Sequence, residues 1–289
     1  MKSLKLLLTA FVLCSANDLF SQEQKSEWFT ATKINSRVWR IDDHLAANLY
    51  LISGTDSALL IDTGIGAADL VSFIKKVTNL PLRIINTHGH GDHAGADYQF
   101  SKIFISALDS TEARQSAFKE NRVNAAINML RGASPEAGYL FKGKEIPFDI
   151  VPITEGMVFH LGGCSIEVIE TPGHTPGSIC LLDREDKLLF TGDNDNTAVW
   201  LFLPNSLPLE VYLNSLKKLL NRCSEFDTLL PGHGIPKPAD FIGDQVECVK
   251  EILNHSITPE IYESFAGKAM LAKYGRASVA FNPGNLYKK

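Results

Sequence analysis

The first third of the chain alternates short apolar runs with turn residues. Runs rich in aliphatic and aromatic side chains occur at residues 38–41 (VWRI), 48–52 (NLYLI) and 57–61 (SALLI). An Asp-Asp pair follows the first run, and a Gly-Thr-Asp stretch lies between the second and the third. This spacing is typical of short strands joined by tight turns, so it predicts an antiparallel meander.

The pattern then changes from strand spacing to helix spacing. Residues 67–77 carry apolar side chains at helical intervals and predict a helix. Residues 82–85 (LRII) predict a strand directly after it. The order strand, helix, strand is the signature of an α/β protein.

The second half repeats this outline. Four strands are predicted at 158–161, 165–169, 178–182 and 187–190. Helices are predicted at 208–220 and 238–253, with a short strand at 228–230 between them. With no linker-like stretch, residues 22–289 are expected to form one domain of two β-sheets sandwiched between helices.

Two stretches interrupt this plan. Residues 107–130 have polar helical spacing and residues 132–147 are loop-like, so together they read as an insertion that could cover a site. Residues 198–204 (AVWLFLP) are apolar and predict core packing or, alternatively, a hydrophobic wall of a substrate pocket.

The N-terminus predicts an exported protein. A short basic start is followed by an apolar run at residues 6–14 and then by small and polar residues. This order is typical of a secretory signal peptide, expected to be removed after Ser21. The apolar run is too short to span a bilayer, so no membrane anchor is expected after cleavage. The mature protein is expected in the periplasm or outside the cell.

Composition leaves small-molecule chemistry as the expected activity. The 289 residues are 45% hydrophobic and 21% charged, with a formal net charge of -5. The sequence contains no basic block of the kind that would indicate a nucleic-acid partner. Cys164, Cys180, Cys223 and Cys248 form no C-x-x-C pair, so a thiolate metal site is not expected and Cys180 is read as a core residue.

One segment, INTHGHGDHAG at residues 85–95, concentrates metal-ligating side chains. Residues two apart in an extended segment point the same way, so His88 and His90 can converge on one point. Asp92 and His93 follow a further glycine, which allows the chain to aim them elsewhere. The spacing therefore indicates two metal ions rather than one.

Three more segments place a ligating side chain beside glycine near the end of a predicted strand. They are TPGHTPGS with His174, TGD with Asp193, and PGHG with His233. Functional groups are commonly built on loops held by a rigid scaffold. Imidazole and carboxylate without thiolate suit catalytic zinc, with iron and manganese as alternatives.

These motifs, in this order and spacing, resemble the metallo-β-lactamase superfamily over roughly residues 37–240. The resemblance implies an αβ/βα four-layer sandwich of the α/β class, with the site at the sheet ends. It implies that His88, His90 and His174 bind the first metal. It also implies that Asp92, His93 and His233 bind the second metal, and that Asp193 bridges the two.

The resemblance also implies a mechanism. Two zinc ions share a bridging hydroxide that attacks an acyl carbonyl, and one ion stabilises the oxyanion. Asp92 is expected to be the catalytic residue that orients the nucleophile and carries its proton. Asp62, in IDTG, is expected to support the ligand loops.

The substrate stays open between a lactone, an ester, a thioester and a β-lactam. Asp193 stands where zinc β-lactamases generally have cysteine or serine, which favours the branch with a bridging aspartate. The following residues, Asn194 to Asn196, match neither glyoxalase II nor acyl-homoserine-lactone lactonases.

Alternatives to this exported hydrolase are a β-lactamase proper, a metal-dependent phosphodiesterase and a non-catalytic metal-binding protein. A mononuclear iron sulfur dioxygenase would use only His88, His174 and Asp193. The oligomeric state is not predicted.

Overall fold

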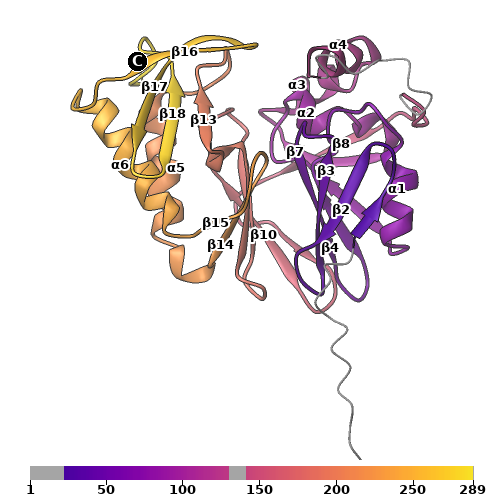
Figure 1. Ribbon diagram of the computed structural model, residues 1–289. Coiled ribbons are helices and arrows are strands. Elements are labelled where there is room, and N and C mark those ends of the chain that lie inside the picture. The colour runs from indigo at the N-terminus through magenta and orange to yellow at the C-terminus, as the bar shows by residue number, and fades with distance from the viewer. Residues whose placement is uncertain (1–22, 130–140, 289) are drawn as a thin grey trace, which may run out of the picture.

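The computed structural model describes residues 23–129 and 141–288. The predicted signal peptide, residues 1–21, and part of the predicted insertion, residues 130–140, lie outside the described residues. Three sheets and the helices that cover them form two halves that face each other (Figure 1). Within the described residues, no helix combines the length and apolarity needed to cross a membrane.

The first sheet has eight strands in sequence order. Strands β3 to β5 pair antiparallel as the predicted meander, β1 and β2, which were not predicted, extend it antiparallel, and β5 to β8 pair parallel. Its strands are β1 (Glu23–Lys25), β2 (Phe29–Lys33), β3 (Val38–Asp43), β4 (Asn48–Ser53), β5 (Ala58–Ile61), β6 (Leu82–Ile85), β7 (Lys102–Ser106) and β8 (Asp149–Ile153).

The second sheet has six strands in the order β15-β14-β12-β11-β10-β9. Its strands β12 and β14 are parallel neighbours. The strands are β9 (Val158–His160), β10 (Ser165–Glu170), β11 (Ile179–Asp183), β12 (Leu188–Gly192), β14 (Thr228–Pro231) and β15 (Lys237–Pro238).

A third sheet, which the sequence pattern did not predict, has the order β13-β18-β17-β16. It combines the Trp200 segment with the C-terminal part of the chain. Its strands are β13 (Ala198–Leu201), β16 (Glu260–Ser264), β17 (Gly267–Tyr274) and β18 (Ala277–Phe281).

Six α-helices and three short 3-10 helices connect these strands within the described residues. The α-helices are α1 (Leu70–Val77), α2 (Gly91–Ala94), α3 (Ser110–Ser116), α4 (Lys119–Met129), α5 (Leu209–Leu220) and α6 (Phe241–Leu253). The 3-10 helices are η1 (Asp97–Gln99), η2 (Asp193–Asp195) and η3 (Cys223–Glu225).

Alternation of side chains along the strands builds the layers. In β4, Leu49 faces the core under α1, whereas Tyr50 faces the core between the first two sheets. In β11, Leu181 faces that same central core, whereas Cys180 faces α5 and α6. Both strands therefore bury both faces, which produces the predicted four layers of helix, sheet, sheet and helix.

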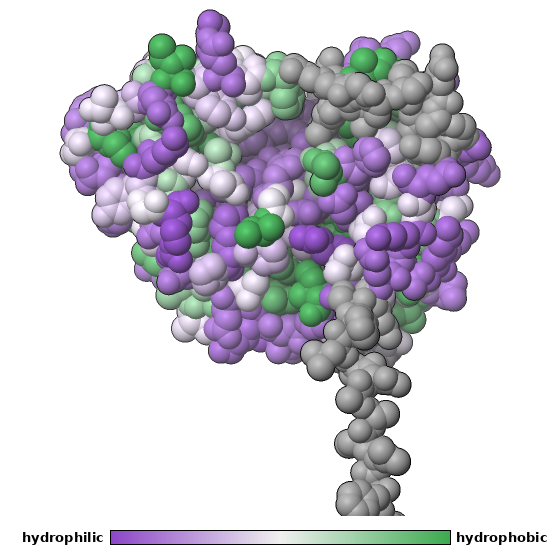
Figure 2. Space-filling model, in the orientation of Figure 1, coloured by the Kyte–Doolittle hydropathy of each residue, from purple (hydrophilic) through white to green (hydrophobic). Residues whose placement is uncertain are grey.

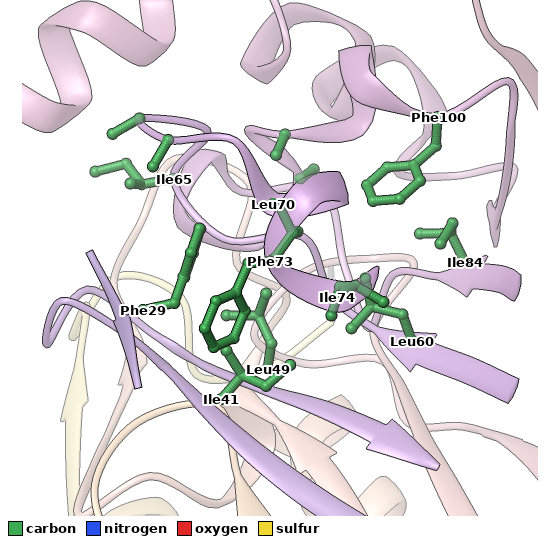
Figure 3. Packing of buried hydrophobic residues seen from close by; sticks show 14 of the residues in the cluster. Phe29, Ile41, Leu49, Leu60, Ile65, Leu70, Phe73, Ile74, Ile84 and Phe100 are labelled. Atoms are coloured by element: carbon green, nitrogen blue, oxygen red, sulfur yellow. The ribbon is translucent and has the colours of Figure 1, made fainter. Parts of the chain in front are cut away.

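Helix α1 shows how the outer layer is held. Its Phe73 and Ile74 pack on Phe29, Leu49 and neighbouring residues of the first sheet (Figure 3). Asp69 caps the helix, since its carboxylate accepts a hydrogen bond from the Ser72 amide at 2.9 Å. The helix begins at Leu70, after the predicted start at residue 67, because this cap ends the preceding loop.

Two other predicted elements differ from the structure. The helix predicted from residue 238 begins at Phe241, because Lys237 and Pro238 pair with β14 as strand β15. Strand β7, which was not predicted, directly precedes the predicted insertion. The described part of that insertion contains α3 and α4. Cys180 is fully buried, as predicted, and the four described cysteines are free.

Candidate metal centre

The seven side chains predicted as metal ligands come together at one place. They form three overlapping groups whose potential ligand atoms lie within 4.8 Å of one another. The groups are His88, His90 and His174; His88, His93 and Asp193; and Asp92, His93 and His233. The other described histidines, His44, His160 and His255, belong to none of these groups.

The ends of four strands position these side chains. The first histidine loop follows β6, His174 lies between β10 and β11, Asp193 follows β12, and His233 follows β14. Gly232 is required where β14 passes the site, because a Cβ there would lie 2.5 Å from Asp193 Oδ1 and 2.8 Å from His93 Cε1. The loops therefore meet closely enough to exclude a larger residue.

In the first group, one ring nitrogen of His88 and one of His174 contact neighbouring residues and thereby orient the imidazoles. His88 Nδ1 lies 3.1 Å from Thr87 Oγ1, while its buried Nε2 has no hydrogen-bond partner. His174 Nδ1 lies 2.7 Å from the Trp200 carbonyl oxygen, which fixes that nitrogen as the donor. Its Nε2 then lies 2.9 Å from His90 Nδ1. An orphaned nitrogen beside two facing nitrogens fits a metal ion.

The group of Asp92, His93 and His233, from here on called the second group, is contacted by Asp62, the residue expected to support the ligand loops. Its carboxylate lies 2.8 Å from His93 Nδ1 and accepts a 2.7 Å hydrogen bond from the Thr87 amide. His93 Nε2 then lies 3.3 Å from His233 Nε2. Asp62 therefore contacts His93 of the second group directly and His88 of the first group through Thr87. Its own backbone has a positive φ of 63°.

Asp193 lies between the two groups. One carboxylate oxygen is 3.2 Å from His93 Nε2. The other is 3.5 Å from both His174 Nε2 and His233 Nε2. This position suits a group that contacts two metal ions.

The two groups differ electrostatically. Burial lowers the pKa of His88, and neighbouring imidazoles lower it further. Burial also lowers the pKa values of His90 and His174. The first group is therefore neutral near pH 7, with lone pairs available to a metal.

Carboxylates reverse this effect in the second group. Burial alone would lower the pKa of His233, but Asp193 and Asp92 outweigh it and raise the pKa to about 10. The same carboxylates raise the pKa of His93 above its ordinary value despite burial. Without a metal, the second group therefore holds protons at pH 7.

We expect the second equivalent of Zn²⁺ to displace these protons and the first equivalent to displace few. Binding at the second group should therefore strengthen as the pH rises from 6 towards 9, because the displaced protons are released into a solution of lower proton concentration. Titration calorimetry at pH 7 in two buffers of different ionisation enthalpy measures the release, expected to be about one proton or more for the second equivalent.

His233→Gln provides the control for this titration, because glutamine carries no titrating proton. The number of protons released on binding of the second equivalent of Zn²⁺ should then be smaller. Equal proton release for both equivalents in the unmodified protein would contradict the assignment of charge to the two groups.

Asp109, which the sequence pattern did not single out, joins the two loops of the first group. Its buried carboxylate accepts hydrogen bonds from the Gly89 amide at 3.2 Å, the Thr175 hydroxyl at 2.5 Å and the Gly177 amide at 2.8 Å. Gly89 lies between two ligand candidates, and Thr175 follows another. Asp109 comes just after β7, and because that strand was not predicted, its strand-end position gave no signal.

Replacing Asp109 by alanine should weaken metal binding about 10- to 100-fold, since three donors lose their acceptor and the two loops lose their link. The change should also destabilise the fold by roughly 3 kcal/mol. Asp69→Ala is the control, because its carboxylate caps α1 through Ser72 and belongs to none of the ligand groups, so this change should leave metal affinity unchanged. Competition with a chelator, below the melting temperature of both variants, measures the affinity. Equal affinities would show that Asp109 stabilises the fold without positioning the ligands.

The metal centre opens into a cavity of about 680 Å³. His90, Asp92, His174, Asp193 and His233 lie at its floor. Its walls include Asn121 and Asn124 of α4, and Trp200, Leu203 and Phe265. The described part of the predicted insertion therefore lines the cavity, and the Trp200 segment serves both expected roles, because Val199 and Leu201 are buried in the core.

The facing sheets and the histidine and aspartate groups at their strand ends define a metal-dependent hydrolase. The family model of the metallo-beta-lactamase superfamily matches residues 42–233. The chain belongs to this superfamily, as its motifs predicted.

Named relatives share most of the chain. The acyl-coenzyme A thioesterase MBLAC2 of Gallus gallus is 30% identical over 241 residues, which cover 72% of this chain and 81% of the relative. The atrochrysone carboxyl ACP thioesterase of Aspergillus terreus is 27% identical over 51% of this chain and 38% of the relative. A metallo-beta-lactamase structure from Pontibacter korlensis shares the fold, with a TM-score of 0.56 and 20% identity over 76% of this chain and 97% of that structure.

Proposed function

We propose that this protein hydrolyses thioesters of small acyl compounds with two bound metal ions, zinc being the preferred metal. The observation that carries the proposal is the set of ligand groups around Asp193, which opens directly into a partly apolar cavity. The names of two relatives, both thioesterases, favour the thioester among the acyl substrates.

In this proposal, His88, His90 and His174 would hold one ion, while Asp92, His93 and His233 would hold the other. Bound there, the ions supply Lewis acidity towards an acyl carbonyl and lower the pKa of water. Asp193 contributes an oxygen to each side.

Asp92 is the proposed catalytic residue. Its carboxylate lies 3.2 Å from His233 Nε2 and 3.8 Å from His93 Nε2, at the cavity floor. Burial raises the pKa of Asp92, but the two imidazoles outweigh burial and lower it. The ionised carboxylate can accept a proton from the attacking water and deliver it to the leaving sulfur.

A substrate panel tests this function. Acetyl and butanoyl thioesters of N-acetylcysteamine should be hydrolysed faster than nitrocefin, a homoserine lactone or bis-p-nitrophenyl phosphate. Metal analysis of the active protein should give two zinc ions per chain. Fast hydrolysis of nitrocefin, of the phosphodiester or of the lactone would contradict the thioesterase function. One iron ion per chain with oxygen-dependent activity would contradict a hydrolase function altogether.

The same proposal includes export, supported by the order of basic, apolar and small residues in positions 1–21. Expression of the full chain in a Gram-negative host should place the enzyme in the periplasm with Gln22 at its N-terminus. Mass spectrometry of the periplasmic protein checks the cleavage. Recovery of the uncleaved chain in the cytoplasm would refute export.

A further inference from the structure

The third sheet brings an aromatic cluster to the cavity. Trp200 of β13 and Phe265, at the turn between β16 and β17, have ring centroids 5.5 Å apart. Tyr262 of β16 accepts a 3.1 Å hydrogen bond from Trp200 Nε1, and Phe202 packs 5.2 Å from Trp200. The indole is thus held in place before any ligand arrives. Phe265 and Tyr262 lie beyond residue 233, where the family match ends, whereas Trp200 lies within the matched region.

Phe265 is a large aromatic residue that stays exposed. It keeps 66% of its surface accessible, although it lines the cavity together with Trp200. On the face of the molecule shown in Figure 2, hydrophobic residues occur as separate small patches among hydrophilic ones. At the cavity, by contrast, the rings of Trp200 and Phe265 are in contact, and ligand pockets are lined predominantly by hydrophobic and aromatic side chains.

The aromatic wall is continuous with the metal centre. The Trp200 carbonyl oxygen lies 2.7 Å from His174 Nδ1, so the strand that carries the indole also orients a proposed ligand. In the other half of the molecule, α4 also lines the cavity, with the amides of Asn121 and Asn124 and with Ala125 (Figure 1). An acyl compound bound at the metal centre would therefore have both the aromatic rings of the third sheet and the amides of α4 within the same cavity.

We propose that Trp200 and Phe265 form an acyl-chain subsite that selects substrates with long apolar acyl groups. This inference rests on the proposed thioesterase function and names its substrate class. The chain would lie along the two rings, and the polar remainder of the thioester would lie towards the asparagines of α4.

The first test compares acyl chain lengths in hydrolysis. For the unmodified protein, kcat/KM towards N-acetylcysteamine thioesters should rise about two- to fourfold per methylene from butanoyl to decanoyl. Phe265→Ala should lower kcat/KM for the decanoyl thioester about tenfold and leave that for the acetyl thioester unchanged. Phe265→Leu keeps an apolar side chain and should restore most of the decanoyl activity.

Ile261→Ala is the matched control. Ile261 lies on the same β16–β17 hairpin, is 76% exposed and does not line the cavity. This variant should retain the full preference for long chains. Melting curves of all variants confirm that they are folded at the assay temperature.

The second test measures binding without hydrolysis. Calorimetry of the metal-loaded protein should show that decanoate binds at least about thirtyfold more tightly than butanoate, and Phe265→Ala should reduce this ratio about tenfold. Equal affinities for the two acids, or an unchanged ratio in Phe265→Ala, would overturn the subsite. Preserved chain-length preference in binding, with no hydrolysis of any thioester, would refute the thioesterase function and support the subsite.

Discussion

Replacing Asp92 by asparagine is expected to lower kcat about a thousandfold or more while both metal ions stay bound. Asparagine has the same shape and keeps an oxygen, so it can still ligate, but it cannot accept a proton. The Asp92 carboxylate faces the cavity beside His233 and His93, where a proton from attacking water would be taken up. Steady-state kinetics with the acetyl thioester, together with metal analysis of the same sample, measures both quantities.

Asp227→Asn is the control for this change. Asp227 is exposed and directly precedes β14, at the opposite end of that strand from His233. It should keep full activity and full metal content. Substantial hydrolysis by Asp92→Asn with both metals present would show that another group carries the proton.

Replacing Asp193 by asparagine is expected to cause the largest loss of metal. Its two oxygens lie within 3.5 Å of His93, His174 and His233, so it is the one charge shared by both groups of ligand candidates among the described residues. Loss of an outer partner already weakens binding 10- to 100-fold in metal sites, so loss of this inner carboxylate should cost at least about a hundredfold. Activity should fall with the metal content.

A second measurement separates this electrostatic role from misfolding. Asp193 is a main cause of the raised pKa of His233, so Asp193→Asn should lower that pKa from about 10 in the metal-free protein. Nuclear magnetic resonance titration of the imidazole reports the shift. Asp195→Asn, in the same 3-10 turn but in none of the ligand groups, should keep the metals. Full metal content in Asp193→Asn would disprove its proposed bridging position.

Much of the fold followed from apolar periodicity. Strands such as β4 and β11 are buried on both faces and therefore form continuous apolar runs, which are easy to recognise. Strand β16 was not predicted, because its residues are exposed or half-buried and give no such run. Strand β7 alternates buried and partly exposed side chains over only five residues, which is a weak signal between two polar stretches.

The sequence by itself determined the set of ligand candidates, because imidazoles and carboxylates beside glycines at strand ends are a chemical pattern that needs no coordinates. It also indicated two destinations for the side chains of INTHGHGDHAG, since residues two apart share a direction in an extended segment.

Only the tertiary structure decided which distant residues complete the site. Asp109 bonds to loops 20 and 66 residues away in sequence. In the third sheet, β13 and β17 both pair with β18. This pairing brings Phe265, at the turn between β16 and β17, into contact with Trp200 of β13. Such contacts depend on the order in which strands pair, and that order is set by how whole layers bury their apolar faces rather than by any local motif.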